Sequence, residues 1–331
     1  MLYNRLNRQH LHQHHPFTYE FTPMKLWSRY HVPRTVEQAI ELLTEYAGHA
    51  QIIAGGTDLL IDVQAGNHPP IEALIDITRI DEIKQIQIIE DGADRYAEIG
   101  GAVTHSAIVA RPEIRSYATS LVESCGVVGG PQVRNVATIG GNVVHALPAA
   151  DGTLSLVALD ASAEVATPDG RKTYPITELF AGPGKSIVES NRHLLTKFRF
   201  RLSNFGEGSA FQRMMRPQGV ALPILGCAVW IRLDEARERF AAVNISIGPV
   251  TPTPQRAKQI EDSLIGELAN SDSINRAAQL AKQTLKPRTS KYRATAEYRV
   301  EMVELLLRGS LETALVRART GEAIPEGVDQ L

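Results

Sequence analysis

The sequence predicts an α+β protein of two parts, an N-terminal part with glycine-rich turns and a smaller C-terminal part with an antiparallel sheet and helices. Three observations carry this prediction. A short strand–helix–strand pattern lies near the N-terminus, glycine pairs follow several apolar stretches before residue 150, and two apolar strand patterns precede two helical patterns after residue 220. Strands followed by helices are typical of an α+β layer. The length of 331 residues agrees with about two domains.

Composition excludes several classes of function. The formal charge is −2 and the charges of both signs are interspersed, so no large basic face for nucleic acid is expected. The longest apolar stretch, residues 220–231, contains Pro223 and Gly226 and is too short to span a bilayer. The two cysteines, Cys125 and Cys227, are too few for a disulfide scaffold or a cysteine-ligated metal site, and no metal is expected on this chain. We expect buried thiols and a cytoplasmic protein.

Residues 1–23 contain the tract HLHQHH, but they have no apolar core of signal-peptide length and no small-residue cleavage site. A histidine-rich tract can bind metal ions, although nothing near it in the sequence supplies a fixed geometry. We therefore expect a disordered N-terminal extension rather than a targeting signal or a metal site.

The first folded elements are expected to form a strand–helix–strand unit. Thr35 followed by Gln38 is a capping-box pattern that predicts a helix start. The sequence AQIIAGG predicts a short strand ending at glycine, a helix is expected over residues 57–64, and EALIDIT over residues 72–78 predicts another strand. The apolar face of the first helix is formed by Val36, Ala39, Ile40 and Leu43.

The stretch IIAGGTDLL, residues 52–60, has the composition of an anion-binding turn. Gly55 and Gly56 allow backbone angles and a close ligand approach that other residues prevent, and the amides of Thr57 and Asp58 begin a helix without intrahelical acceptors. Such amides bind phosphate groups. The alternative is an ordinary strand-to-helix turn capped by Thr57. The stretch does not fit G-x-G-x-x-G, so a nicotinamide dinucleotide-binding fold is not supported.

Two further glycine turns follow along the chain. Residues 96–108 predict a strand and a glycine turn, and residues 112–126 predict one helix. Residues 129–152 contain a β-branched stretch, a turn at Gly140-Gly141-Asn142 and a second apolar run before Asp151. Two amide-rich turns can hold the two phosphates of one pyrophosphate, with side-chain donors added by Thr57, Thr138 and Asn142.

The sequence of the C-terminal part predicts a sheet followed by helices. Strands are expected over residues 222–233 and 240–248, and the prolines of TPTPQR, residues 251–256, predict a rigid connector. Helices are expected over residues 273–285, where apolar residues recur at helical spacing, and over residues 290–315.

The motifs AGGTDLL and TIGGNVVHALPAAD, in this order, resemble those of the FAD-binding medium subunit of molybdenum hydroxylases, the family of xanthine dehydrogenase and carbon monoxide dehydrogenase flavoproteins. ELFAGPGKS and IGPVTPTPQRAKQIEDSL extend the resemblance toward the C-terminus. The resemblance implies a two-part FAD-binding domain of the p-cresol methylhydroxylase-like type over residues 24–203, divided into a small subdomain (24–80) and a larger α/β subdomain (81–203). It further implies a C-terminal flavoprotein domain over residues 204–318 and a tail over 319–331.

The resemblance also implies which residues contact FAD. Residues 54–59 match the first pyrophosphate loop, residues 138–142 match the second, and Gly101 and Ala102 match a turn between them. Further contacts lie near the ribityl chain, the flavin or the adenine. Arg213 occupies a place where relatives carry a lysine. The implied contacts are Ala54, Gly55, Gly56, Thr57, Asp58, Leu59, Gly101, Ala102, Thr138, Gly140, Gly141, Asn142, Val144, Asp151, Leu194, Leu195 and Arg213.

Several of these residues have a structural alternative. Asp151 could cap a helix beginning at Gly152, and Asn142 could serve only to form a turn. His105 and His145 could suggest a covalent flavin, but the resembled family holds FAD non-covalently, so we expect ordinary packing or surface histidines. The sequence GPGKS does not complete a P-loop, because position 179 is a leucine.

The resemblance implies an electron-transfer role within a larger complex. A molybdenum-pterin cofactor on a large subunit would hydroxylate the substrate, two [2Fe-2S] clusters on a small subunit would pass electrons to the FAD of this chain, and an external acceptor would receive them. The resemblance implies a dimer of heterotrimers. The two cysteines indicate the form without an iron–sulfur insertion, and no residue is nominated as catalytic.

Two rival interpretations remain open at the level of sequence. A self-contained FAD-dependent oxidase or reductase of the same broad fold would act on its own substrate, and a scaffold subunit would use the glycine turns only as architecture. Neither the hydroxylated substrate nor the electron acceptor follows from the residues. If FAD is bound as implied, a valine in place of Gly56 or Gly141 is predicted to displace it.

Overall fold

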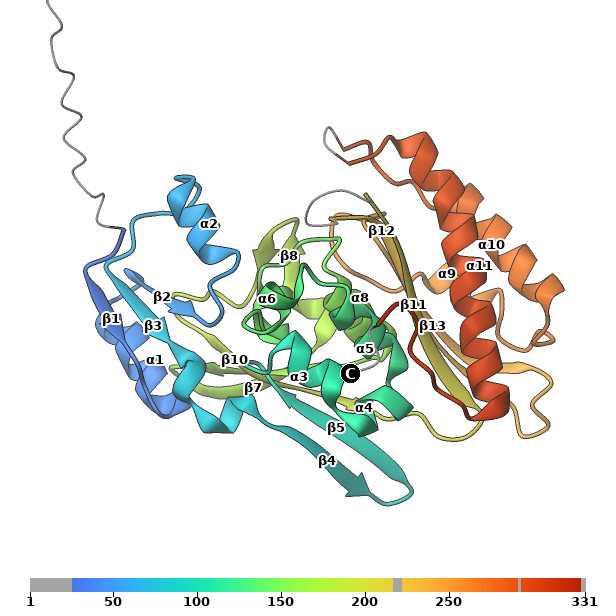
Figure 1. The fold of residues 1–331 in the computed structure, drawn as a ribbon, viewed down its shortest axis with the longest axis horizontal. Coiled ribbons are helices and arrows are strands. Elements are labelled where there is room, and N and C mark those ends of the chain that lie inside the picture. Colours follow the sequence, from blue (N-terminus) through green and yellow to red (C-terminus); the bar gives the residue numbers. More distant parts are fainter. Residues whose placement is uncertain (1–25, 217–221, 291–292, 329–331) are drawn as a thin grey trace, which may run out of the picture.

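The computed structural model describes residues 26–216, 222–290 and 293–328. The predicted N-terminal extension, residues 1–23, lies outside these ranges. In the described chain the three larger sheets follow one another from left to right in Figure 1, and helices lie between and against them. The predicted α+β class is confirmed, including the antiparallel sheet in the C-terminal part.

The first sheet is parallel and has the strand order β1-β3-β2. Helix α1 begins as the capping box predicts, because the Thr35 hydroxyl accepts a hydrogen bond from the Gln38 amide at 3.1 Å. Its apolar face is buried against this sheet, with Val36, Ala39 and Leu43 nearly inaccessible. The elements are β1 (Arg29–His31), α1 (Val36–Glu45), β2 (Ala50–Ile53), α2 (Leu59–Gln64) and β3 (Ala73–Asp76).

The central sheet is antiparallel throughout, with the order β4-β5-β10-β6-β7. Two 3-10 turns, Ile77–Arg79 and Asp81–Lys84, lead into it from the first sheet. Its strands are β4 (Ile86–Asp91), β5 (Asp94–Gly100), β6 (Ser162–Thr167), β7 (Gly170–Pro175) and β10 (Leu194–Arg201), and a small hairpin is formed by β8 (Phe180–Gly182) and β9 (Lys185–Ser186).

Six helices lie between β5 and β6, and two of them differ from the prediction. The single helix expected over residues 112–126 is broken at Ala118, whose dihedral angles (φ −145°, ψ 50°) are not helical. This break lets the following helix turn toward the C-terminal sheet, where the Ser120 amide donates to the Ser209 hydroxyl. The helices are α3 (His105–Ala110), α4 (Pro112–Tyr117), α5 (Thr119–Gly126), α6 (Pro131–Arg134), α7 (Ile139–Val144) and α8 (Asp151–Ala158).

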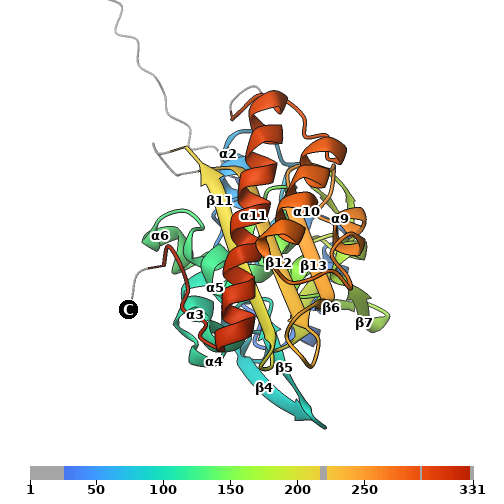
Figure 2. The same cartoon turned by 90° about the vertical axis from the view of Figure 1, so that its right-hand side faces the viewer.

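The C-terminal sheet is an antiparallel meander covered on one face by helices (Figure 2). The predicted strands and the helix predicted over residues 273–285 are confirmed, whereas the last helix begins at Ala296 and ends at Thr320 instead of spanning residues 290–315. Cys227 is buried on β12 as expected, as is Cys125 on α5. The elements are β11 (Glu207–Met215), β12 (Pro223–Leu233), β13 (Phe240–Gly248), α9 (Lys258–Asp262), α10 (Ser271–Thr284) and α11 (Ala296–Thr320).

The chain after α11 does not leave the molecule as a free tail. Residues 321–328 run back to α5, where the Glu326 amide donates to the Glu123 carboxylate at 2.8 Å. The same carboxylate binds Arg317 of α11 at 2.6 Å and accepts from the Phe211 amide of β11. Because Glu123 is 2% exposed, this satisfied ion pair ties the central helices to the C-terminal sheet in the protein interior.

Candidate functional site

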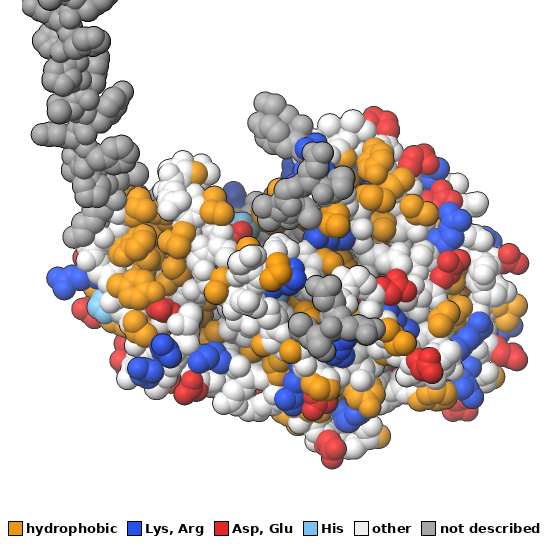
Figure 3. Space-filling view, in the orientation of Figure 1, with side chains coloured by type: hydrophobic (Ala, Val, Ile, Leu, Met, Phe, Trp, Pro, Cys, Tyr) orange, Lys and Arg blue, Asp and Glu red, His pale blue; other side chains and the backbone are white. Residues whose placement is uncertain are grey.

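A cavity of about 710 Å³ lies where the first sheet, the central helices and the C-terminal sheet meet. In the space-filling view the surface is hollowed between the N-terminal part and the rest of the molecule (Figure 3). Sixteen of the seventeen predicted cofactor contacts line the cavity: Ala54, Gly55, Gly56, Thr57, Asp58, Leu59, Gly101, Thr138, Gly140, Gly141, Asn142, Val144, Asp151, Leu194, Leu195 and Arg213. Ala102 does not, because its side chain is buried in the core beneath the first sheet.

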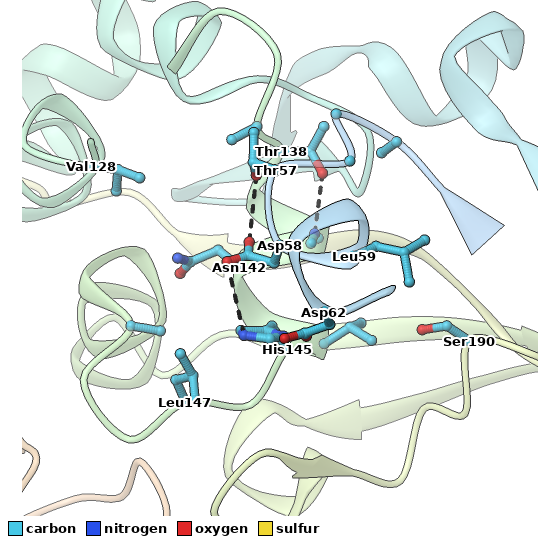
Figure 4. A pocket seen from close by; sticks show the side chains of 18 of the residues that line it. Thr57, Asp58, Leu59, Asp62, Val128, Thr138, Asn142, His145, Leu147 and Ser190 are labelled. Atoms are coloured by element: carbon cyan, nitrogen blue, oxygen red, sulfur yellow. Dashed lines mark hydrogen bonds and ion pairs between the residues drawn. The ribbon is translucent and has the colours of Figure 1, made fainter. Parts of the chain in front are cut away.

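The first wall of the cavity is the loop from Ala54 to Asp58, between β2 and α2 (Figure 4). Gly56 has a positive φ of +68°, which a glycine adopts without strain. The backbone N–H groups of residues 55–58 donate no hydrogen bond to any residue the structure describes. Consecutive amides without a protein partner at a cavity wall can bind an anionic ligand.

The second wall, around Thr138, differs from the predicted turn. Gly140 and Gly141 lie in the first turn of α7, and Thr138 caps this helix by accepting from the Gly141 amide at 3.1 Å. The Gly140 amide donates to the Gly101 carbonyl at 2.9 Å. These amides are therefore occupied within the protein, and the second loop offers a side-chain-free surface rather than a second set of free main-chain donors.

Backbone contacts explain why glycine is needed at the base of the cavity. A Cβ atom on Gly55 would lie 2.1 Å from the Val136 carbonyl oxygen, and one on Gly140 would lie 2.4 Å from the Gly101 carbonyl oxygen. No side-chain rotation relieves such contacts, so the glycines allow the two loops to approach each other closely. Gly141 is different, because a Cβ there would meet only a side-chain atom, the Thr138 hydroxyl at 3.2 Å, and the residue is exposed.

The side chain of Asn142 uses its oxygen within the protein, while its Nδ2 donates to no residue that the structure describes, so its role as a donor stays a prediction. Its Oδ1 accepts from the amide and the hydroxyl of Thr153, both at 3.1 Å, so the residue joins α7 to α8. The Thr57 hydroxyl is directed to Asp58 at 3.4 Å, and Asp58 Oδ1 lies 3.9 Å from His145 Nε2 (Figure 4). Asn142 therefore has a structural role within the cavity wall.

Asp151 is not the helix cap that its position could suggest. It is the first residue of α8, Ala150 precedes it as the cap, and its Oδ2 accepts from Arg213 Nη1 at 2.6 Å. The two side chains are only 5% and 7% exposed. Burial raises the pKa of Asp151 to about 6, although the charges of Arg213 and Arg293 act in the opposite direction.

Apolar residues from several elements complete the lining. Leu194 and Leu195 begin β10, and Val144 ends α7. The cavity also includes residues that the sequence patterns did not single out, among them His68, Val128, Ser190, His193, Leu222 and Arg293. These lie outside helices and strands, where no hydrophobic periodicity or glycine pattern marks them.

His105 and His145 have different surroundings in the cavity. His105 is 1% exposed, and its Nδ1 has no hydrogen-bond partner among the described residues. The His145 side chain is 33% exposed and faces Asp58. Burial, with a smaller contribution from Arg134, lowers the pKa of His105 to about 4.

The depressed pKa of His105 predicts that acid destabilises the protein. The unfolded chain takes up a proton near pH 6.5 and the folded chain only near pH 4, so the stabilisation is full above pH 6.5 and is lost as the pH falls toward 4. When the pH is lowered from 7.5 to 5, we expect the free energy of unfolding of wild type to fall by about 2 kcal/mol more than that of His105→Gln. Urea unfolding of the FAD-free chain at both pH values measures this loss. Equal pH dependence in the two proteins would contradict it.

The cavity fits FAD on observations of the protein alone. It offers four unpaired amides for phosphates, apolar side chains for aromatic rings, and a buried carboxylate oxygen, Asp151 Oδ1, without a partner among the described residues. Among the residues that the structure describes, no three His, Cys, Asp or Glu side chains come together as a metal site. No helix within these residues is long and apolar enough to cross a membrane.

Both parts of the chain match known protein families. Residues 20–200 match the model of the FAD binding domain in molybdopterin dehydrogenase, and residues 209–314 match that of the CO dehydrogenase flavoprotein C-terminal domain. The xanthine dehydrogenase FAD-binding subunit of Escherichia coli O157:H7 is 29% identical over 293 residues, which cover 88% of this chain and 97% of that protein.

Carbon monoxide dehydrogenases are similar in sequence and in structure. The medium chain from Hydrogenophaga pseudoflava is 28% identical, covering 87% of this chain and 97% of its own length. The solved structure of the enzyme from this organism, in a form lacking the Mo-pyranopterin moiety, superposes with a TM-score of 0.80 at 28% identity, over 88% of this chain and 98% of that chain. The chain therefore belongs to the family of FAD-binding subunits of molybdopterin dehydrogenases, and it is an oxidoreductase flavoprotein subunit.

Proposed function

We propose that this chain is the FAD-carrying electron-transfer subunit of a multi-subunit molybdenum hydroxylase, which passes electrons from the [2Fe-2S] clusters of a partner subunit to an external acceptor. The observation that carries the proposal is the cavity, which is lined both by four free backbone amides and by the glycine surface of α7. FAD supplies the chemistry of taking up and releasing electrons there, and the residues of this chain bind and orient it.

The proposed contacts divide by chemistry. The amides of Gly55, Gly56, Thr57 and Asp58 hold the pyrophosphate, and the bare surface at Gly140 and Gly141 allows it to come close. Apolar contacts come from Val144, Leu194 and Leu195, and polar contacts come from Asp151 and Arg213. No residue is assigned as a general acid or base.

The proposed assembly contains a large molybdopterin-binding subunit and a small iron–sulfur subunit, arranged as a dimer of heterotrimers in the cytoplasm. The name "medium chain" of the carbon monoxide dehydrogenase relatives supports the subunit composition. Both cysteines of this chain are buried, and two thiols are too few for the four cysteine ligands that a [2Fe-2S] cluster takes, so the clusters are assigned to a partner. We also propose the domain limits 24–203 and 204–318.

Co-expression with the neighbouring reading frames tests the proposed function. We expect a yellow complex with two further chains, about one FAD per copy of this chain, and flavin bleaching when an organic substrate of the complex is added. The flavin absorbance near its visible maximum measures both occupancy and reduction. A yellow monomer that reduces a small substrate alone would support a self-contained oxidase, and a colourless protein would support a scaffold; either result would contradict the proposal.

A further inference from the structure

One buried ion pair in the cavity wall connects two separate parts of the protein. Asp151 begins α8 among the central helices, and Arg213 lies on β11 of the C-terminal sheet, 62 residues later in the chain. Their side chains meet at 2.6 Å, are almost fully buried and both line the cavity. The pair is therefore a contact between the two parts and a portion of the site at once.

Each partner in this pair keeps one polar atom without a hydrogen bond. Asp151 Oδ1 and Arg213 Nε are buried, and neither has a partner among the described residues. A buried charged group that is left partly unsatisfied is costly, so such atoms at a cavity wall indicate a ligand that completes them. Asp151 Oδ1 accepts a hydrogen bond and Arg213 Nε donates one. A ligand that carries both a donor and an acceptor can therefore pair with them.

The charges around Asp151 favour keeping it ionised when a ligand is present. Arg213 and Arg293 act on it from the C-terminal part, and burial, with a smaller contribution from Asp151, raises the pKa of the Cys125 thiol on α5. Burial opposes ionisation in the protein alone. A hydrogen bond from a ligand hydroxyl or N–H to Oδ1 would offset part of that burial cost.

We propose that the Asp151–Arg213 pair is a cofactor-dependent latch, in which FAD completes the hydrogen bonding of both side chains and thereby holds the C-terminal sheet against α8. This inference rests on the proposed function, because it takes FAD as the occupant of the cavity. If FAD binds more tightly when the ion pair is formed than when it is broken, FAD stabilises the contact between the two parts. Thermodynamic linkage then requires that breaking the contact raises the dissociation constant of FAD by the same factor.

A second buried ion pair provides a matched control. Glu123 and Arg317 also join the central helices to the C-terminal part at 2.6 Å, but they do not line the cavity. The carboxylate of Glu123 is fully used by Arg317 and by the amides of Phe211 and Glu326. It therefore has no free atom for a ligand, and its loss affects stability without affecting FAD directly.

The test compares FAD affinity in variants of the full-length chain, measured by quenching of free FAD fluorescence. We expect Asp151→Asn and Arg213→Gln each to raise the dissociation constant about tenfold or more. Arg213→Lys keeps the charge and some donors, so its dissociation constant should rise less than that of Arg213→Gln. Glu123→Gln should lower the unfolding temperature, and because it removes no atom that lines the cavity, it should change FAD affinity less than Asp151→Asn or Arg213→Gln does.

Hydrogen exchange of the β11 amides provides the readout of the latch itself. FAD should slow exchange in residues 207–215 of wild type and of Glu123→Gln, and this slowing should be lost in Arg213→Gln. If wild type binds FAD while the Asp151 and Arg213 variants bind it equally well, or if β11 exchange does not respond to FAD, the latch is wrong although the proposed function stands. A wild-type chain that binds no FAD would overturn the proposed function as well.

Discussion

A methyl group at position 55 is expected to cost the chain a large part of its stability. The Cβ of Gly55→Ala would lie 2.1 Å from the Val136 carbonyl oxygen and 2.9 Å from the Ala137 amide nitrogen. Both atoms belong to the backbone, so the first loop must separate from the segment that precedes α7. We expect the free energy of unfolding to fall by at least about 4 kcal/mol, measured by urea denaturation of the FAD-free chain.

Gly141→Ala is the control for the destabilisation expected in Gly55→Ala. Its Cβ would meet only the Thr138 hydroxyl at 3.2 Å, and the residue lies within α7, where alanine is favoured over glycine by about 1 kcal/mol. Gly141→Ala should therefore unfold within about 1 kcal/mol of wild type. If Gly55→Ala unfolds at the same urea concentration as Gly141→Ala, the close approach of the two loops is not a feature of the folded protein.

Local patterns in the sequence were sufficient for some of the elements. The capping box at Thr35 predicts the start of α1 because one hydroxyl and one amide, three residues apart, decide it. Apolar alternation and helical spacing likewise predict β12, β13 and α10, since these elements bury one side in the C-terminal core. Glycine pairs marked the cavity, because backbone proximity at Gly55 and Gly140 excludes any side chain.

The structure differs from the sequence prediction where contacts with segments distant in the sequence determine the local structure. Asp151 at the start of a helix has the local pattern of a cap, but Arg213 on β11 takes its carboxylate instead. The break at Ala118 is followed by α5, whose Ser120 amide donates to the Ser209 hydroxyl of the C-terminal sheet. Residues 321–328 look like a tail because their composition has no periodicity, yet Glu123 binds the amide of Glu326. None of these partners is near in sequence.

The structure also changes which glycine gives a clear test of cofactor binding. Gly56 has a φ of +68°, so any other residue there is strained whether or not a ligand is present. A valine at Gly56 would confuse loss of folding with loss of FAD. Gly141 has ordinary helical geometry, is exposed and lines the cavity, so a larger side chain there meets the ligand before it meets the protein.

Gly141→Val is therefore expected to lose FAD while remaining folded. The branched side chain would occupy the space beside the free amides of the first loop, where the pyrophosphate is proposed to bind. We expect FAD affinity to fall at least about a hundredfold, which corresponds to about 2.7 kcal/mol. The far-ultraviolet circular dichroism of the FAD-free variant should match that of wild type, and Gly141→Ala should show a smaller loss of affinity. Full FAD occupancy in a folded Gly141→Val protein would show that α7 does not face the cofactor, and the pyrophosphate would then have to be placed on the first loop alone.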